Sequence, residues 1–212
     1  MRQDLETRLR DGIAALSLAL PATAVPRLLD YLALLQHWNR HYNLTAVRDP
    51  HEMVTRHLLD SLAVLPWVHG ANLADLGAGA GLPGIPLALA EPSRRVTLVD
   101  SNGKKARFMR AALRELGIDN AEVVEGRVES LCGRHDCITA RAFASLPDML
   151  QWGAHLLAPD GRWLAMKGRY PAEEVASLPA GIVLEHTVTL DVPGLDAERH
   201  LLILRRQPED ET

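Results

Sequence analysis

A glycine-rich segment at residues 75–84 constrains the fold of this chain more than any other feature of its sequence. It reads Asp-Leu-Gly-Ala-Gly-Ala-Gly-Leu-Pro-Gly and follows a short apolar run. Glycine lets a backbone turn sharply and approach a ligand closely, and Pro83 suits the first turn of a helix, where its missing N–H is not needed. A second apolar run, at 95–99, ends at Asp100. Because an acid at that place can accept both hydroxyls of a ribose, the pattern predicts a nucleotide-like cofactor site.

The elements around this segment predict a sheet with crossover helices. From Asn72 onward, short β-rich runs alternate with helical ones, which is typical of a mainly parallel sheet. Only a turn at 193–196 separates the last two expected strands, so we expect them to form an antiparallel hairpin. The acidic residues 209–211 are expected to be disordered. The seven expected strands are residues 73–76, 96–100, 121–125, 137–141, 162–167, 183–192 and 200–205.

Residues before the first strand have the periodicity of helices. One series of leucines recurs at helical spacing in the segment 28–35 and a second apolar series does so in 54–65. A chain of 212 residues, 47% of them hydrophobic, has room for one substantial core rather than two. We therefore expect a helical extension at 1–70 and one cofactor-binding domain at 71–212.

Composition limits where the chain acts and what it binds. No apolar run reaches the roughly 20 residues needed to cross a bilayer, and the first residues lack the apolar core of a signal peptide, so we expect a cytoplasmic protein without a membrane partner. Cys132 and Cys137 are too few for a disulfide framework or a zinc site, which predicts two reduced thiols and no metal. With a net charge of -4, any binding of nucleic acid requires a local basic surface.

The glycine segment by itself is compatible with two kinds of cofactor. Residues 79–84 also fit the G-x-G-x-x-G pattern of NAD-binding proteins, so nicotinamide or flavin binding remains an alternative. S-adenosylmethionine is favoured because Asp75 precedes the glycines, where the cofactor's methionine ammonium group offers a cationic partner. The chain also ends in a hairpin, without the length for a separate dehydrogenase substrate domain. By analogy we predict an α/β, Rossmann-like class I methyltransferase fold: a seven-stranded, mostly parallel sheet with a C-terminal antiparallel hairpin.

Several motifs in a fixed order resemble one family over nearly the whole chain. The most specific are Gly-Leu-Pro-Gly-Ile-Pro at 81–86 and Arg-Ala-Phe-Ala-Ser at 141–145, which are not general methyltransferase features. The sequence resembles the bacterial small-subunit (16S) ribosomal RNA guanine-N7 methyltransferases, also called the glucose-inhibited division protein B family. One departure lies at 78–81, where the family's Thr-Gly-Pro-Gly is Ala-Gly-Ala-Gly, a change that we expect the site to tolerate. Further matching segments are residues 38–45, 48–53, 56–61, 98–101, 166–168 and 198–201.

The resemblance also implies cofactor-binding residues. They lie on the glycine loop, after the third strand and at the end of the fourth. Ligands of open α/β sheets lie beyond the carboxyl ends of the strands, where all these positions fall. Two residues have alternative interpretations: an exposed carboxylate at a helix start for Glu129, and a structural ion pair for Arg141. Together with the acids and glycines already named, the expected cofactor site consists of Asp75, Gly77, Gly79, Leu82, Asp100, Val128, Glu129 and Arg141.

The implied chemistry needs positioning rather than acid–base catalysis. Guanine N7 carries a lone pair outside the aromatic system, so it can attack a methyl group without first losing a proton, and no general base is expected. Arg141 is the expected catalytic residue, in a positioning role in contact with both cofactor and target. A cysteine nucleophile at the catalytic face is not expected, because Cys137 begins the fourth strand at its opposite end.

Binding of ribosomal RNA requires cations near the site despite the net charge. Lys167, Arg199 and His200 fall near the carboxyl ends of strands or in the final hairpin, and Phe143 and Arg141 are expected to form a plane for a splayed base. Arg56 and His57 precede Asp60 and Ser61 by one helical turn, which fits substrate contact or a surface salt bridge. The helix after Asp100 carries a basic face, formed by Lys104, Arg107, Arg110 and Arg114, that also suits any solvated amphipathic helix.

We expect a monomer that acts on small-subunit ribosomal RNA within a ribosomal subunit or an assembly intermediate. Two alternatives stay open at this point. One is a small-molecule methyltransferase with the same cofactor domain. The other is a non-enzymatic ribosome-assembly factor that retains the fold, against which the intact Asp75, Asp100 and Arg141 argue.

Overall fold

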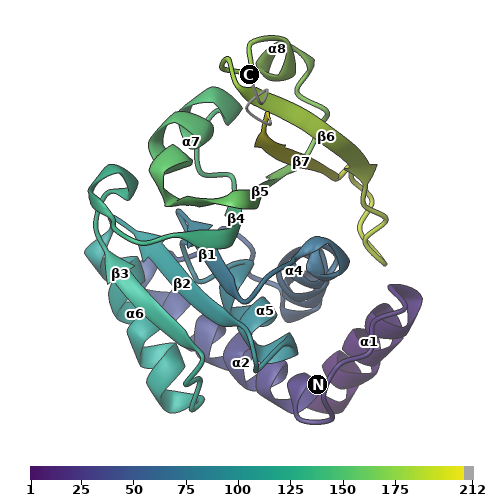
Figure 1. Cartoon of the computed structure of the whole chain (residues 1–212). Coiled ribbons are helices and arrows are strands. Elements are labelled where there is room, and N and C mark those ends of the chain that lie inside the picture. Colours follow the sequence, from purple (N-terminus) through teal and green to yellow (C-terminus); the bar gives the residue numbers. More distant parts are fainter. Residues whose placement is uncertain (208–212) are drawn as a thin grey trace.

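The computed structural model describes residues 1–207 and contains one seven-stranded sheet in the order β3-β2-β1-β4-β5-β7-β6 (Figure 1). Strands β1 to β5 run parallel, whereas β7 is antiparallel to both β5 and β6. The predicted mostly parallel sheet and antiparallel hairpin are confirmed. The strands are β1 (Asn72–Leu76), β2 (Arg95–Asp100), β3 (Ala121–Glu125), β4 (His135–Arg141), β5 (Leu157–Lys167), β6 (Ile182–Thr189) and β7 (His200–Arg206). The acidic residues 209–211, for which disorder was predicted, lie outside the described residues.

Two strands differ clearly from their predicted bounds. β5 begins at Leu157 rather than residue 162, because Leu157 already pairs with His135 of β4. β6 ends at Thr189 rather than residue 192. Beyond it Pro193 lacks the N–H that a ladder needs, and Val192 turns into the core formed with the N-terminal helices. The hairpin connection is therefore longer than predicted.

Alternating side chains give the sheet two buried faces. Leu73, Leu98 and Cys137 contribute to one core cluster, and their neighbours Ala74, Val99 and Ile138 to the other. The first face is covered by α2 (Ala24–Tyr42), α5 (Gly84–Ala90) and α6 (Gly103–Glu115), and the second mainly by α7 (Leu146–Gly153) with the short α8 (Ala172–Ala176) (Figure 1). The result is a three-layer α/β arrangement.

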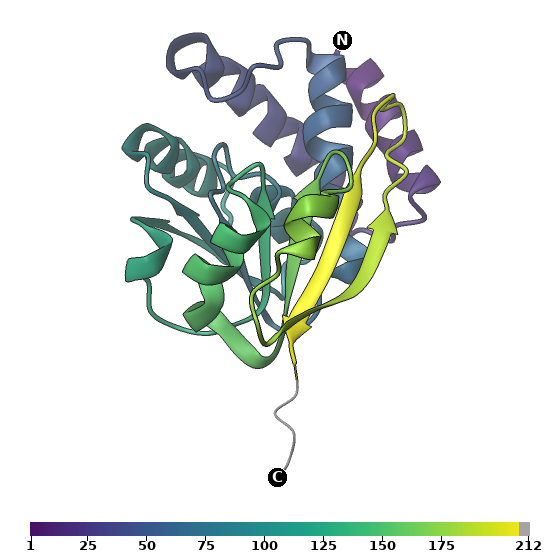
Figure 2. The same cartoon turned by 90° about the horizontal axis from the view of Figure 1, so that it is seen from above.

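The N-terminal segment is helical, as predicted, and shares its core with the sheet. It contains α1 (Arg2–Ala15), α2 and a bent helical segment formed by α3 (Pro50–Met53), a π-helical turn at Val54–Leu59 and α4 (Asp60–Leu62). Asp49 begins this segment, because its carboxylate accepts a hydrogen bond from the backbone of His51. The connection between β6 and β7 reaches back to α1 (Figure 2), so Pro193 and Gly194 lie beside the first helix.

None of the helices in residues 1–207 is both long enough and apolar enough to span a membrane. The same residues contain no group of three or more His, Cys, Asp or Glu side chains arranged to hold a metal ion. Cys132 is exposed and Cys137 is buried, and both are free thiols.

Candidate functional site

The glycine loop between β1 and α5 is held open by backbone and side-chain hydrogen bonds. Gly77 and Gly79 have φ angles of +67° and +62°, which residues with a Cβ adopt only with strain. The Asp100 carboxylate accepts from the Gly79 N–H at 2.9 Å and from the Asn102 N–H at 2.8 Å. The buried Tyr31 hydroxyl donates to the Ala80 carbonyl at 2.7 Å. These hydrogen bonds fix the loop at the carboxyl ends of β1 and β2.

Asp75 lies beneath this loop rather than on its surface. Its side chain is fully buried, and one oxygen accepts from the Gly84 N–H at 2.8 Å. The other oxygen has no hydrogen-bond partner in the described structure. Burial raises the pKa of this carboxyl to about 7, although the Gly84 N–H and Arg141 oppose the rise. Asp75 does not line the adjacent cleft, so any attraction to a ligand acts from behind the loop.

A cleft of about 540 Å³ opens above the glycine loop. It is lined by Ala78, Gly79 and Leu82 of the glycine loop, by Thr45 and His57 of the N-terminal segment, and by Arg141, Met166 and Lys167 at the ends of β4 and β5. This volume lies within the range of about 300–1,000 Å³ that is usual for ligand sites. Five of the six charged residues that line the cleft are cations: Arg56, Lys105, Arg141, Lys167 and Arg199, with Asp60 as the acid. The cleft is therefore locally basic in a chain whose net charge is -4.

Asp60 lies at the centre of the charged wall. Its carboxylate is 1% exposed and pairs with Arg141 at 3.0 Å and with Arg199 at 2.9 Å. The sequence left two alternatives for Arg56 and Asp60, substrate contact or a surface salt bridge between them, and among the described residues this salt bridge is not formed. A π-turn at Val54–Leu59 changes the helical phase, so Arg56 is exposed at the cleft while Asp60 is buried. Arg141 also donates to the Arg56 carbonyl at 3.0 Å.

His57 is a neutral residue that also lines the cleft. It is 6% exposed, and its Nε2 lies 2.9 Å from the Thr45 hydroxyl. Burial, together with the charge of Arg141, lowers its pKa to about 4, so the imidazole is uncharged at neutral pH. The buried Asn39 amide fixes Thr45 by bonding both its N–H and its carbonyl. His57 lines the cleft through this network and adds no charge to the basic surface.

A second, smaller cavity of about 230 Å³ lies on the other side of Gly77. It brings together the predicted Asp100, Val128 and Glu129 with Phe143 and Trp152. The predicted plane of Phe143 and Arg141 is not formed, because a turn at Ala142, with φ +51°, directs the two side chains to different cavities. Phe143 instead packs edge-on against Trp152, with the ring centroids 5.8 Å apart.

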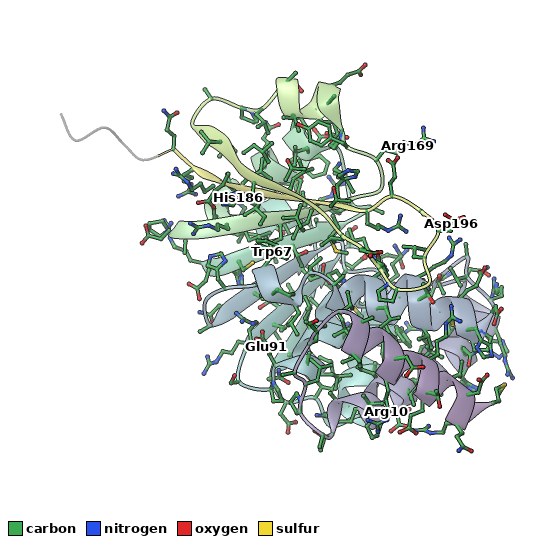
Figure 3. All side chains as sticks on the ribbon, turned by 90° about the vertical axis from the view of Figure 1, so that its right-hand side faces the viewer. Arg10, Trp67, Glu91, Arg169, His186 and Asp196 are labelled. Atoms are coloured by element: carbon green, nitrogen blue, oxygen red, sulfur yellow. The ribbon has the colours of Figure 1, made fainter. Side chains whose placement is uncertain are left out.

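The remaining predicted RNA contacts lie at the rim of the cleft or away from it. Lys167 pairs with Glu174 at 2.9 Å, and His200 bonds to the Gly168 carbonyl at 2.9 Å. Arg169 projects from this end of the sheet, whereas Trp67 lies toward the other (Figure 3). The basic face of α6 is exposed as predicted, but none of its four residues lines the cleft. Lys105, which the sequence analysis did not single out, does line it.

Comparisons with known proteins identify the family. A family model described as rRNA small subunit methyltransferase G matches residues 24–202. A protein of Stenotrophomonas maltophilia named ribosomal RNA small subunit methyltransferase G is 59% identical, over 92% of both chains. The chain belongs to this family. A methyltransferase G of Marinobacter nauticus is 54% identical over 94% of each chain, and one of Neisseria meningitidis is 52% identical over 94% of this chain and 98% of its own.

Solved structures confirm the class I methyltransferase fold of this methyltransferase G family member. The O-methyltransferase TomG of Streptomyces achromogenes, solved in complex with SAM, has a TM-score of 0.59 at 13% identity and covers 94% of this chain and 96% of its own. TrmN of Thermus thermophilus has a TM-score of 0.58 at 20% identity, covering 80% of this chain and 53% of that protein. These identities support the fold alone.

The structure also reveals site residues that sequence reasoning missed. Thr45 lines the cleft, the buried Asn39 holds its backbone, and Asp60 joins two cleft arginines. Asn39 and Thr45 were marked in the sequence only by the segment 38–45, which matches the methyltransferase G family, and Asp60 was considered only together with Arg56. Neither signal gave an indication of which side chains meet.

Proposed function

We propose that this chain transfers a methyl group from S-adenosylmethionine to N7 of a guanine in small-subunit ribosomal RNA. S-adenosylmethionine-dependent methylation of 16S ribosomal RNA is the activity of its family, and the choice of guanine N7 is the finer step. The observation that carries the proposal is a cleft with five cations directly above a glycine loop that ends a parallel strand. Cations at that place suit a polyanionic substrate beside a nucleotide-like cofactor.

The residues present fit the cofactor. Gly79 faces open space, and the Asp100 carboxylate ends β2 beside it. Val128 and Glu129 line the second cavity, where an adenine ring would be bordered by Phe143. We propose that the cofactor is held by these residues together with Gly77, Leu82 and Arg141, while the Asp75 charge attracts its ammonium group from behind the loop. Bound there, S-adenosylmethionine supplies an electrophilic methyl group on a positively charged sulfur.

The cleft residues suit a reaction that needs alignment and no proton transfer. Guanine N7 already carries a free lone pair, so the protein must hold the base in line with the methyl group. His57 is suited to shaping the cleft rather than to accepting a proton, because burial and Arg141 lower its pKa to about 4 and its Nε2 is engaged by Thr45. Arg141 is the proposed positioning catalytic residue, and Arg56, Lys167, Arg199 and His200 are the proposed RNA contacts at the rim. We also propose Phe143 as a border of the cofactor rather than as a base-stacking partner of Arg141.

Transfer of a tritium-labelled methyl group to small ribosomal subunits, followed by N7-specific strand scission, tests the function. We expect label in the RNA and cleavage at one guanine. Labelled RNA without scission would exclude the N7 step alone. No label in RNA, with S-adenosylmethionine still bound, would favour the non-enzymatic assembly factor. Label transferred only to small molecules would favour the alternative methyltransferase.

We further propose a cytoplasmic monomer that acts on a subunit or an assembly intermediate.

Asp100→Ala is expected to weaken binding of S-adenosylmethionine by about 10- to 100-fold. The substitution removes the proposed ribose acceptor and also the bonds to the Gly79 and Asn102 N–H groups, and bonds to a charged group contribute about 1.5–3 kcal/mol each. Isothermal titration calorimetry measures the change. Asp119→Ala, at an exposed acid outside both cavities, is the control and should bind the cofactor normally. Tight binding of NAD by the unmodified protein would overturn the cofactor assignment.

Arg141→Ala is expected to lower kcat for methyl transfer by about 10- to 100-fold, and to lower affinity for the subunit much less. The guanidinium lies in the cleft and is only 22% exposed, so it is placed for the target nucleotide rather than for initial docking. Single-turnover transfer and filter binding measure the two effects separately. Equal losses in both measurements would make Arg141 a docking residue.

A further inference from the structure

We propose that Asp60 is a positioning residue, which holds Arg141 and Arg199 side by side on the wall of the cleft so that both present free N–H groups to the target nucleotide. The inference rests on the proposed function and extends it to a residue that need not touch the substrate. It concerns three segments that are remote in sequence: the helix after the π-turn, the end of β4, and the residue before β7.

The two oxygens of the Asp60 carboxylate accept hydrogen bonds from different arginines. Asp60 Oδ2 accepts from Arg141 Nη1 at 3.0 Å, and Oδ1 accepts from Arg199 Nε at 2.9 Å. The carboxylate is buried, whereas the two guanidinium side chains are 22% and 23% exposed and line the cleft. Each arginine is therefore held at one edge and reaches the cleft with the other.

The nitrogen atoms that are not used in the clamp are available to a ligand. Arg141 Nη1 also bonds to the Arg56 carbonyl, and Arg199 Nη1 bonds to the Glu198 carbonyl at 2.8 Å. Within residues 1–207, the Nη2 groups of both arginines have no hydrogen-bond acceptor. Such groups suit phosphate or carbonyl oxygens of a nucleotide, and a guanidinium that is already fixed loses less rotamer freedom on binding them.

The net charge of Asp60 and its two arginines lets an experiment distinguish the positioning of the arginines from the docking of RNA. One carboxylate between two guanidinium groups leaves a net positive charge at this wall, so Asp60 opposes the attraction of RNA even as it orders the arginines. Neutralising Asp60 makes the wall more positive and less ordered. Turnover should therefore fall without a loss of affinity for RNA, a result that a purely structural role would not produce.

The test is Asp60→Asn, which preserves the shape of the side chain. We expect kcat for methyl transfer to small subunits to fall about 10- to 100-fold, while the Kd for the subunit stays the same or decreases. Glu185→Gln is the matched control, because Glu185 also bridges two arginines, Arg162 and Arg205, far from the cleft. This variant should retain wild-type kcat. An unchanged kcat in Asp60→Asn, or a subunit Kd that rises in proportion to the loss in kcat, would overturn the proposal.

A double-mutant cycle tests whether Asp60 acts through Arg141. In an Arg141→Ala background, Asp60→Asn should lower kcat by clearly less than it does in the wild-type protein, because only Arg199 is left for the carboxylate to position. Additive losses would overturn the proposal. If Asp60→Asn does not fold, Arg199→Gln takes its place in the cycle. The loss of kcat caused by Arg199→Gln should then also be non-additive with the loss caused by Arg141→Ala. A wild-type protein that labels no RNA would contradict the proposed function instead, independently of these variants.

Discussion

Gly79→Ala is expected to weaken S-adenosylmethionine binding by more than about 100-fold, or about 2.7 kcal/mol, while the free protein stays folded. A Cβ added at Gly79 would have only the Gly77 carbonyl nearby, at 3.9 Å, and would otherwise point into open space. The φ angle of +62° costs an alanine about 1–2 kcal/mol. The methyl group would therefore occupy the space proposed for the cofactor and disturb the protein little.

Gly117→Ala is the matched control for this substitution. Gly117 follows α6, has a φ of +59°, and has nothing within 4 Å of a built Cβ. Its alanine should lose a similar amount of stability in chemical denaturation and keep full cofactor affinity in calorimetry. A Gly79→Ala protein that binds as tightly as the Gly117→Ala protein would place the cofactor elsewhere.

The sequence predicted the seven strands, the mostly parallel sheet and the final antiparallel hairpin, and the reason is local. Glycines with positive φ, a strand-ending acid and alternating apolar residues each depend on only a few neighbours along the chain. The same pattern assigned Asp100 and Gly79 to one cofactor site, and in the structure the two are hydrogen-bonded, because parallel strands bring their carboxyl ends to one edge. The largest errors in strand bounds are the start of β5 and the end of β6, and the end of β6 depends on contacts with remote N-terminal helices.

The contacts within the site were not predictable from these patterns. Helical spacing paired Arg56 with Asp60, but the π-turn redirects Asp60 to arginines that lie 81 and 139 positions further along the chain. In the same way, adjacency in sequence suggested that Arg141 and Phe143 act together, whereas one residue with positive φ separates them. Both errors arise where a single backbone irregularity reverses the direction of a side chain, and such irregularities depend on tertiary packing.

Asp75→Asn is expected to stabilise the free protein at and above neutral pH. The wild-type carboxyl is fully buried, with one oxygen unpartnered, and burial raises its pKa from 3.8 to about 7. Asparagine removes this charge and still offers an oxygen to the Gly84 N–H. Burying the new amide costs about 1–2 kcal/mol, so we expect a net gain of about 2 kcal/mol at pH 8. We also expect weaker S-adenosylmethionine binding, because the charge that attracts the ammonium group is lost.

The pH dependence of this gain identifies its cause. Between pH 4 and 7 the native wild-type carboxyl keeps a proton that the unfolded chain has released, so its contribution to stability is present below about pH 4 and is lost as the pH rises through 7. The asparagine variant lacks this loss. Its free energy of unfolding relative to wild type should therefore rise by about 4 kcal/mol from pH 4 to pH 8, as measured by urea denaturation. Asp191→Asn, at an exposed acid, is the control, and its free energy of unfolding relative to wild type should not change with pH. The same pH-independent result for Asp75→Asn would show that burial of the Asp75 carboxylate does not destabilise the protein.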